Sequence, residues 1–322
     1  MAPTERTPLP VSFFGIAVGT LALANAWRIA VPLWQLPAEI AEIMTVAALA
    51  VWALLLVLYA HKWRRHRAAA RTELDHPVQS SFVALVPVSS LLAAMALLPW
   101  SRPVALAVFV LAVVGGSALG LWLYGRPWQG GRAPEQVTPA IYLPAVAQNF
   151  VAGTAAAAFG WHAVGLWFFG AGLFSWFAIE SLILGRATLQ PPLPEALRPL
   201  LGIQLAPAVV GGVSWMAVNH GVPDLFAQVL LGYGLFQAAL LLRLLPWIAR
   251  QAFTPSFWAF SFGVAALPTL AMRLLRAGAI GPLGWLAPLS FAAANAIIGL
   301  LALKTLARLA QGRLLPAATP LR

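Results

Sequence analysis

Long apolar stretches, separated by short polar or charged segments, make up nearly the whole chain. Each stretch has about 20 residues, which is the length an α-helix needs to cross roughly 30 Å of hydrocarbon. The pattern therefore predicts an all-α polytopic membrane protein with ten transmembrane helices. The predicted spans are Val11–Ala30, Ile40–Ala60, Ser80–Leu98, Pro103–Tyr124, Pro139–Phe159, Ala163–Leu184, Pro199–Val218, Leu225–Leu245, Ser256–Leu274 and Leu283–Ala310.

Short connections on one side join these spans into five helical hairpins. The first span of each hairpin carries a glycine or proline within its apolar run, whereas the second is richer in large aliphatic residues. Lipid tolerates irregular backbone only where protein covers it or where it lines a cavity. We therefore expect the first spans to surround a central pore and the second spans to face lipid. The pore-lining residues expected from this pattern are Gly15, Pro87, Pro144, Pro207 and Gly263.

Composition supports a membrane protein without a separate soluble domain. Of the 322 residues, 61% are hydrophobic and 9% are charged, against about 25% charged residues in soluble proteins. We expect one transmembrane channel domain over residues 1–322, with short cytoplasmic tails at 1–10 and 311–322. The N-terminus lacks the pattern of a cleavable signal, so the first span is expected to remain in the mature protein.

The basic residues indicate the orientation. A net charge of +11 could suit nucleic acid, but these residues lie at the ends of the spans, so nucleic acid is not an expected partner. With both termini inside, 16 of the 20 Lys and Arg fall on the inner side, and the positive-inside rule places the termini in the cytoplasm. The basic run Lys62–Arg71 either serves only to keep this loop on the cytoplasmic side of the membrane, or it binds anionic lipid or a partner.

Candidate catalytic groups are sparse. The chain has no cysteine, and its five histidines fall in or beside loops, so neither a metal nor a cofactor is expected. There is no nucleophile motif, phosphate loop or paired-carboxylate site, which disfavours an enzyme. Glu180 is the one acidic residue predicted inside a span. It either pairs with a cytoplasmic-side arginine such as Arg186 or Arg243, or acts as a proton-coupling carboxylate.

The predicted pore is uncharged. Backbone dipoles and a few polar side chains would line it, so ions would be selected by the cost of dehydration, and the basic cytoplasmic end favours anions. Phe262 lies at the break beside Gly263 and is expected to plug the pore, whereas Phe260 is expected to pack between helices. The polar side chains expected at the pore are Ser89 and Asn149, with Ser90, Gln148 and Gln204 as further candidates.

Short blocks in a fixed order recur along nearly the whole chain, at Phe13–Ile16, His76–Val78, Phe82–Pro87, Tyr142–Ala147, Asn149–Phe150, Phe168–Gly172, Leu205–Pro207, Asn219–Gly221, Gly232–Gly234, Leu242–Trp247 and Trp258–Gly263. With these blocks the chain resembles the family of the tellurite-resistance protein TehA, the slow anion channels of guard cells and the fungal malate permeases. The resemblance implies a homotrimer with a pore in each subunit, occluded by a phenylalanine that matches Phe262. The family's first inner helix usually has a proline where this chain has Ala17, so a weaker kink is expected there.

These observations together predict an anion channel of the bacterial inner membrane, gated by Phe262, that conducts inorganic or small organic anions. One alternative is a proton-coupled exporter of tellurite or C4-dicarboxylates, for which Glu180 is the intramembrane candidate. Another is a non-conducting membrane partner of a cytoplasmic enzyme, with Lys62–Arg71 as the docking site.

Overall fold

The computed structural model describes residues 9–279 and 281–315, and no strand occurs among them. Nine helical segments in this part of the chain are long and apolar enough to cross a membrane. They coincide with nine predicted spans, with ends shifted by a few residues. Most of both predicted tails, including Arg6 and Arg322, lies outside the described residues.

The remaining predicted span, Pro139–Phe159, is helical but divided. It consists of the 3-10 helix η4 (Pro139–Ile141), the π-helix η5 (Leu143–Ala147) and α7 (Gln148–Ala158). Pro144 lies in the first turn of η5, where its missing N–H removes no internal hydrogen bond. Because of this division, the count of ten spans stays a prediction.

The other interrupted spans follow the same plan, a short N-terminal piece and then an α-helix. The glycine or proline noted in the sequence falls within the first three residues of the helix that follows the break, where a proline is tolerated. α1 continues through Ala17 without a break. The pieces are η1 (Val11–Phe13) with α1 (Phe14–Trp34), α4 (Gln79–Phe82) with α5 (Leu85–Leu97), η6 (Glu195–Leu205) with α9 (Ala206–Val218), and η7 (Pro255–Phe260) with α11 (Ser261–Arg276).

Each interrupted span packs against the long continuous helix that follows it. Buried residues make up 56 to 78% of the apolar windows in four interrupted spans, but 22 to 33% in the five continuous helices among the described residues. Burial thus follows the expected division into inner and outer helices. The continuous helices are α2 (Ala38–Arg65), α6 (Arg102–Gly125), α8 (His162–Leu189), α10 (Leu225–Ile248) and α12 (Leu283–Ala310), with α3 (Arg67–Asp75) and the short η2 (Arg126–Gln129) and η3 (Pro134–Gln136) in the loops.

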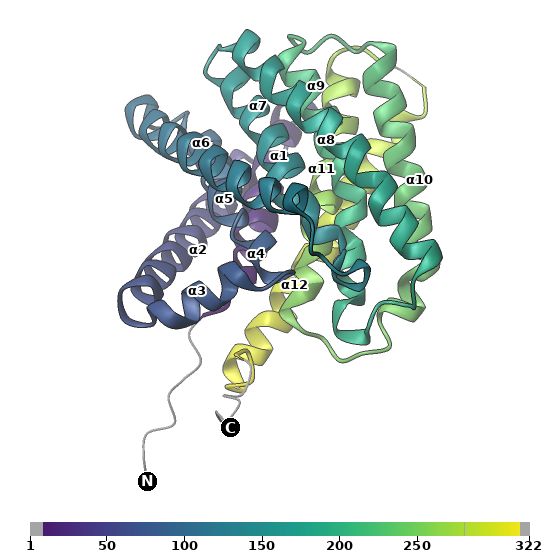
Figure 1. The fold of residues 1–322 in the computed structure, drawn as a ribbon. Coiled ribbons are helices and arrows are strands. Elements are labelled where there is room, and N and C mark those ends of the chain that lie inside the picture. The colour runs from purple at the N-terminus through teal and green to yellow at the C-terminus, as the bar shows by residue number, and fades with distance from the viewer. Residues whose placement is uncertain (1–8, 280, 316–322) are drawn as a thin grey trace.

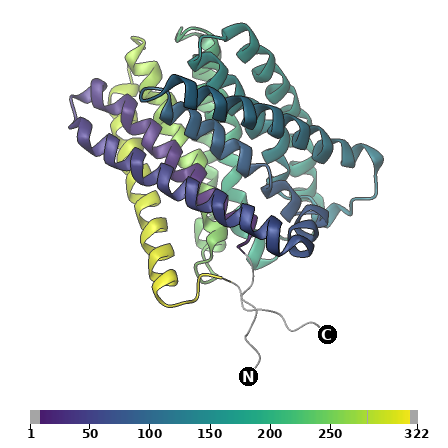
Figure 2. The same ribbon diagram turned by 90° about the vertical axis from the view of Figure 1, so that its left-hand side faces the viewer.

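The interrupted helices contact one another in a closed ring. α1 contacts α5, α5 contacts α7, α7 contacts α9, α9 contacts α11, and α11 contacts α1. Figure 1 shows α2 and α6 on one side of this group and α10 on the other. Figure 2, turned toward the side of α2 and α6, shows these two helices running obliquely across the face.

Small residues allow the ring helices to approach closely, as is common in membrane proteins. A Cβ atom at Gly19 in α1 would lie 2.2 Å from Oγ of Ser261 in α11. A Cβ atom at Gly263 would lie 2.8 Å from Cβ of Leu205 in η6. The start of α11 is therefore held tightly between α1 and η6, and this fixes the position of Phe262.

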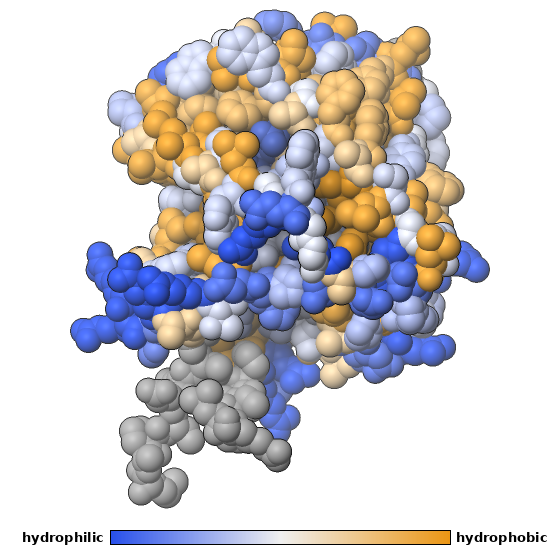
Figure 3. Space-filling view, viewed as in Figure 1, coloured by the Kyte–Doolittle hydropathy of each residue, from blue (hydrophilic) through white to orange (hydrophobic). Residues whose placement is uncertain are grey.

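The surface divides into an apolar zone and a polar band. In Figure 3, hydrophobic residues cover much of the upper part of the face, and hydrophilic residues form a band across the lower part at the level of α3. The basic run Lys62–Arg71 lies in this region. Lys62 Nζ is buried, 2.7 Å from Glu73 Oε1 and 3.0 Å from the Leu9 carbonyl oxygen, so this lysine joins α2 to α3 and to the start of the described chain.

Candidate functional site

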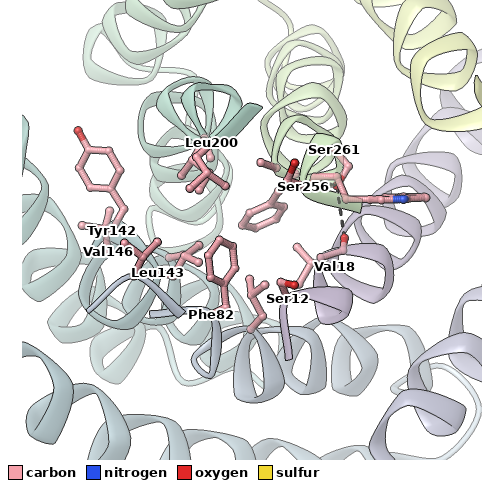
Figure 4. Close-up of a pocket in the computed structure, with 18 of the residues that line it drawn as sticks. Ser12, Val18, Phe82, Tyr142, Leu143, Val146, Leu200, Ser256 and Ser261 are labelled. Atoms are coloured by element: carbon pink, nitrogen blue, oxygen red, sulfur yellow. Dashed lines mark hydrogen bonds between the residues drawn. The ribbon is translucent and has the colours of Figure 1, made fainter. Parts of the chain in front are cut away.

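A largely apolar cavity of about 130 Å³ lies among the N-terminal parts of the interrupted spans. Figure 4 shows the Phe82 ring pointing into it, with Leu200 and Leu143 on other walls. No charged side chain of the described residues lines this first cavity. Its walls come from η1, α1, α4, α5, η5, α7, η6, α9, η7 and α11.

A second cavity, of about 210 Å³, lies toward the C-terminal ends of the same helices. Most of its lining is apolar, including Leu92 and Val213. Asn25, Thr154 and Thr269 add polar groups, and Arg273 is the charged residue that lines it in the described chain.

Phe262 lines both cavities, together with Val210 of the facing helix α9. The half-buried ring of Phe262 therefore lies between the first cavity and the second. Phe260 lines neither cavity, and a Cβ atom at Gly202 would lie 2.5 Å from Cδ2 of Phe260. The expectation that Phe260 packs between helices agrees with this contact.

The segment before Phe262 is anchored by hydrogen bonds. The buried Trp258 donates from Nε1 to Oγ1 of Thr305 in α12, at 2.9 Å. Ser261 Oγ donates to the Trp258 carbonyl oxygen at 2.7 Å and lies 3.4 Å from the Gly15 carbonyl oxygen. The backbone that carries Phe262 is thus tied to α1 and α12, so movement of the ring requires a side-chain rotation or a shift of this whole contact.

The residues expected to line a pore separate into two groups. Gly15 and Pro207 line the first cavity together with Phe262. Pro87 lines a groove among α2, α5 and α6, and Pro144 lines a polar pocket beside Arg126. Neither proline lines the first or the second cavity.

The other three expected residues line neither cavity. Gly263 packs against Leu205, as described above. Ser89 is buried and donates from Oγ to the Val86 carbonyl oxygen at 2.9 Å, and Asn149 donates from Nδ2 to the Ala145 carbonyl oxygen at 2.6 Å. The side-chain donors of Ser89 and Asn149 are thus bonded to carbonyl oxygens three and four residues earlier in the chain.

Sequence reasoning missed most of the cavity walls, such as Val18, Phe82, Val146 and Val210. These are ordinary apolar residues of the interrupted spans, and nothing in their spacing separates them from core residues. Arg273 is one of the four basic residues that fall on the outer side in the predicted orientation. Because few basic residues fall on that side, its position there was the signal in the sequence that could have pointed to a role for Arg273.

The expected arginine partner of Glu180 is absent among the described residues, and this expectation is corrected. Instead, the Glu180 carboxylate accepts hydrogen bonds from Tyr142 Oη, from Trp176 Nε1 at 2.8 Å and from Tyr233 Oη at 3.2 Å. Three uncharged donors satisfy this group, which is possible because hydroxyl and indole donors can solvate a carboxylate in place of water. In Figure 4 the Tyr142 hydroxyl points away from the first cavity.

Comparisons of the sequence with known proteins point to one family. A family described as voltage-dependent anion channel matches residues 8–306. The chain is 34% identical over 311 residues to the "Tellurite resistance protein TehA homolog" of Haemophilus influenzae, covering 96% of this chain and 94% of that protein. It is 24% identical over 278 residues to an uncharacterized transporter of Methanocaldococcus jannaschii, covering 78% of this chain and 80% of that protein. The chain therefore belongs to the voltage-dependent anion channel family, and it is similar to the TehA homolog of H. influenzae.

Proposed function

We propose that this protein is an anion channel whose path runs through the first and second cavities and is closed at Phe262. The observation that carries the proposal is that the Phe262 ring lines both cavities. Val210 faces the same point from α9, so the narrow point is apolar. Membership of a family described as voltage-dependent anion channels supports conduction of anions.

A dry apolar constriction is a barrier because an ion there loses water and gains no partner. Rotation of one ring, or a small shift of the start of α11, would join the two cavities. The backbone anchors at Trp258 and Ser261 favour ring rotation, since they hold the helix that carries Phe262. The gate is thus a side chain on a fixed support.

Selectivity in this proposal follows from the apolar narrow point. We expect permeability in the order iodide and nitrate, then bromide, then chloride, with sulfate lowest, because weakly hydrated anions lose water at less cost. Reversal potentials in planar bilayers under paired-anion gradients, with a Phe262→Ala channel to ensure current, measure this order. A permeability order led by sulfate would contradict the proposal, because fast passage of sulfate requires strong charged ligands along the path.

Proton-coupled export is the second candidate, and Glu180 is the observation that favours it. Its carboxylate accepts a hydrogen bond from Tyr142, which is one of the residues that line the first cavity, so protonation of Glu180 would alter a hydrogen bond made by a residue of the cavity wall. A channel gives anion current without proton dependence, whereas an exporter gives saturable flux that follows the proton gradient. Anion efflux from proteoliposomes, with and without a pH gradient, separates the two.

Glu180→Gln is expected to lower stability and leave anion flux largely intact. The amide has one acceptor oxygen, and its NH₂ group would face hydroxyl and indole donors that now bond to a carboxylate. Loss of hydrogen bonds to a charged group costs about 1.5–3 kcal/mol each. Thermal unfolding and efflux are measured on the same preparation. Normal stability with lost pH-dependent flux would instead support the exporter.

We further propose that ten helices form five hairpins around the pore, with both termini in the cytoplasm of a bacterial inner membrane, and that three copies assemble. The inside bias of basic residues supports the orientation, and family resemblance supports the trimer. Because the natural chain has no cysteine, single cysteines introduced into each loop can be labelled from either side without background. Light scattering of purified protein gives the number of copies.

A further inference from the structure

Arg273 lies where the second cavity meets a pocket at the end of the bundle. It lines the second cavity with Phe262, and it lines the outer pocket, of about 380 Å³, with Arg276 and Ala277. Arg273 and Phe262 both belong to α11 and are separated by about three turns. The outer pocket, Arg273, the second cavity and the narrow point at Phe262 therefore follow one another in space.

The charge of Arg273 has no counter-charge in the described chain. No acidic side chain of these residues lines the second cavity or the outer pocket. The four ion pairs of the described chain do not include Arg273. Its Nε is buried and has no hydrogen-bond partner among the described residues. A charge in this setting is costly unless something pairs with it.

The other arginines on the predicted outer side differ from Arg273. Arg28 donates to the Ala96 carbonyl oxygen and lies 3.4 Å from Glu42. Arg102 donates to the Phe159 carbonyl oxygen at 3.1 Å, and Arg276 is exposed. Arg273 is thus the half-buried arginine of this group that borders the second cavity.

The neighbouring polar side chains already donate hydrogen bonds to backbone carbonyl oxygens. Thr269 Oγ1 donates to the Ala265 carbonyl oxygen at 2.7 Å, and Thr154 Oγ1 donates to the Phe150 carbonyl oxygen at 3.0 Å. Asn25 Nδ2 lies 3.4 Å from the Leu92 carbonyl oxygen. The guanidinium of Arg273 is therefore the principal set of donors available to a solute entering the second cavity.

We propose that Arg273 forms a binding site for a small monovalent anion in the second cavity, on the path to the Phe262 gate. The proposal rests on the proposed channel function. Arg273 attracts anions and repels cations at the entrance, whereas the apolar narrow point ranks anions by dehydration. One guanidinium in an otherwise apolar cavity holds the anion loosely, as passage requires.

The conduction test uses the Phe262→Ala channel in planar bilayers with potassium iodide and potassium chloride. Arg273→Gln should lower the anion-to-cation permeability ratio by about tenfold at low salt, within the range for focused charge in a cleft, and leave the iodide-to-chloride order unchanged. Arg273→Lys should restore most of the ratio. The effect should shrink in 1 M salt, where the screening length is about 3 Å.

Arg102→Gln is the matched control, because it removes the same charge on the same predicted side at an exposed residue that lines neither the second cavity nor the outer pocket. An equal loss in the Arg102 and Arg273 variants would overturn the site, since only general surface charge would then act. Unchanged ratios in Arg273→Gln would overturn it as well.

A measurement without conduction separates failure of the site from failure of the channel proposal. Crystals of the protein soaked in iodide should show anomalous density beside the Arg273 guanidinium, and the Arg273→Gln protein should not. Density with no current in any variant would uphold the site and reject the channel. Current without density, and with unchanged ratios, would uphold the channel and reject the site.

Discussion

Replacing Phe262 with alanine is expected to raise anion conductance by more than about tenfold. The ring lines both cavities, and its removal joins them without adding charge. A barrier lowered by about 1.4 kcal/mol raises a rate about tenfold, and passage of an ion through a dry apolar plug costs more than this. The native protein should conduct little under the same conditions. Single-channel recording of both proteins in planar bilayers measures the change.

Phe260→Ala provides the matched control for this experiment. Phe260 has the same side chain two positions away, but it packs against Gly202 and lines neither cavity. Its removal should loosen the contact between η6 and η7 and leave the closed path unchanged. If Phe262→Ala shows native conductance while it remains folded, or if Phe260→Ala opens the channel equally, Phe262 is not the gate.

Gly165→Ala is expected to cause a large loss of stability. Gly165 in α8 faces Gly153 in α7, and an added Cβ atom would lie 2.8 Å from the Gly153 carbonyl oxygen and 2.9 Å from Cγ1 of Val218. Backbone cannot move aside as a flexible side chain can, so the two helices must separate. Overpacking of this kind costs about 1–3 kcal/mol. The apparent melting temperature of the solubilised protein reports the loss.

Gly170→Ala tests the same change on the same helix without the clash. Apart from Gly170 itself, its two chain neighbours and the nearby backbone of its own helix, no heavy atom of the described residues lies within 4 Å of a Cβ atom built at Gly170. Alanine is also favoured over glycine in a helix by about 1 kcal/mol. This variant should melt at or above the native temperature. Equal melting of the two variants would show that the close contact of α7 with α8 does not limit stability.

The sequence by itself determined where the helices lie and which of them are interrupted. Hydrophobicity is a local property of the chain, so apolar runs located the spans to within a few residues. Pro144 and Pro207 marked breaks correctly, because a proline constrains its own turn whatever its surroundings. The division between buried and exposed helices followed from the small residues of the interrupted spans.

The tertiary structure alone decided which face of each helix borders a cavity. Rotation about a helix axis is set by packing against neighbours, and in spans that are apolar all round no periodicity reveals it. Gly15 and Pro87 carried the same sequence signal, yet only Gly15 lines the first cavity. For the same reason, the donors around Glu180 and the position of Arg273 beside the second cavity became visible only when distant segments were brought together.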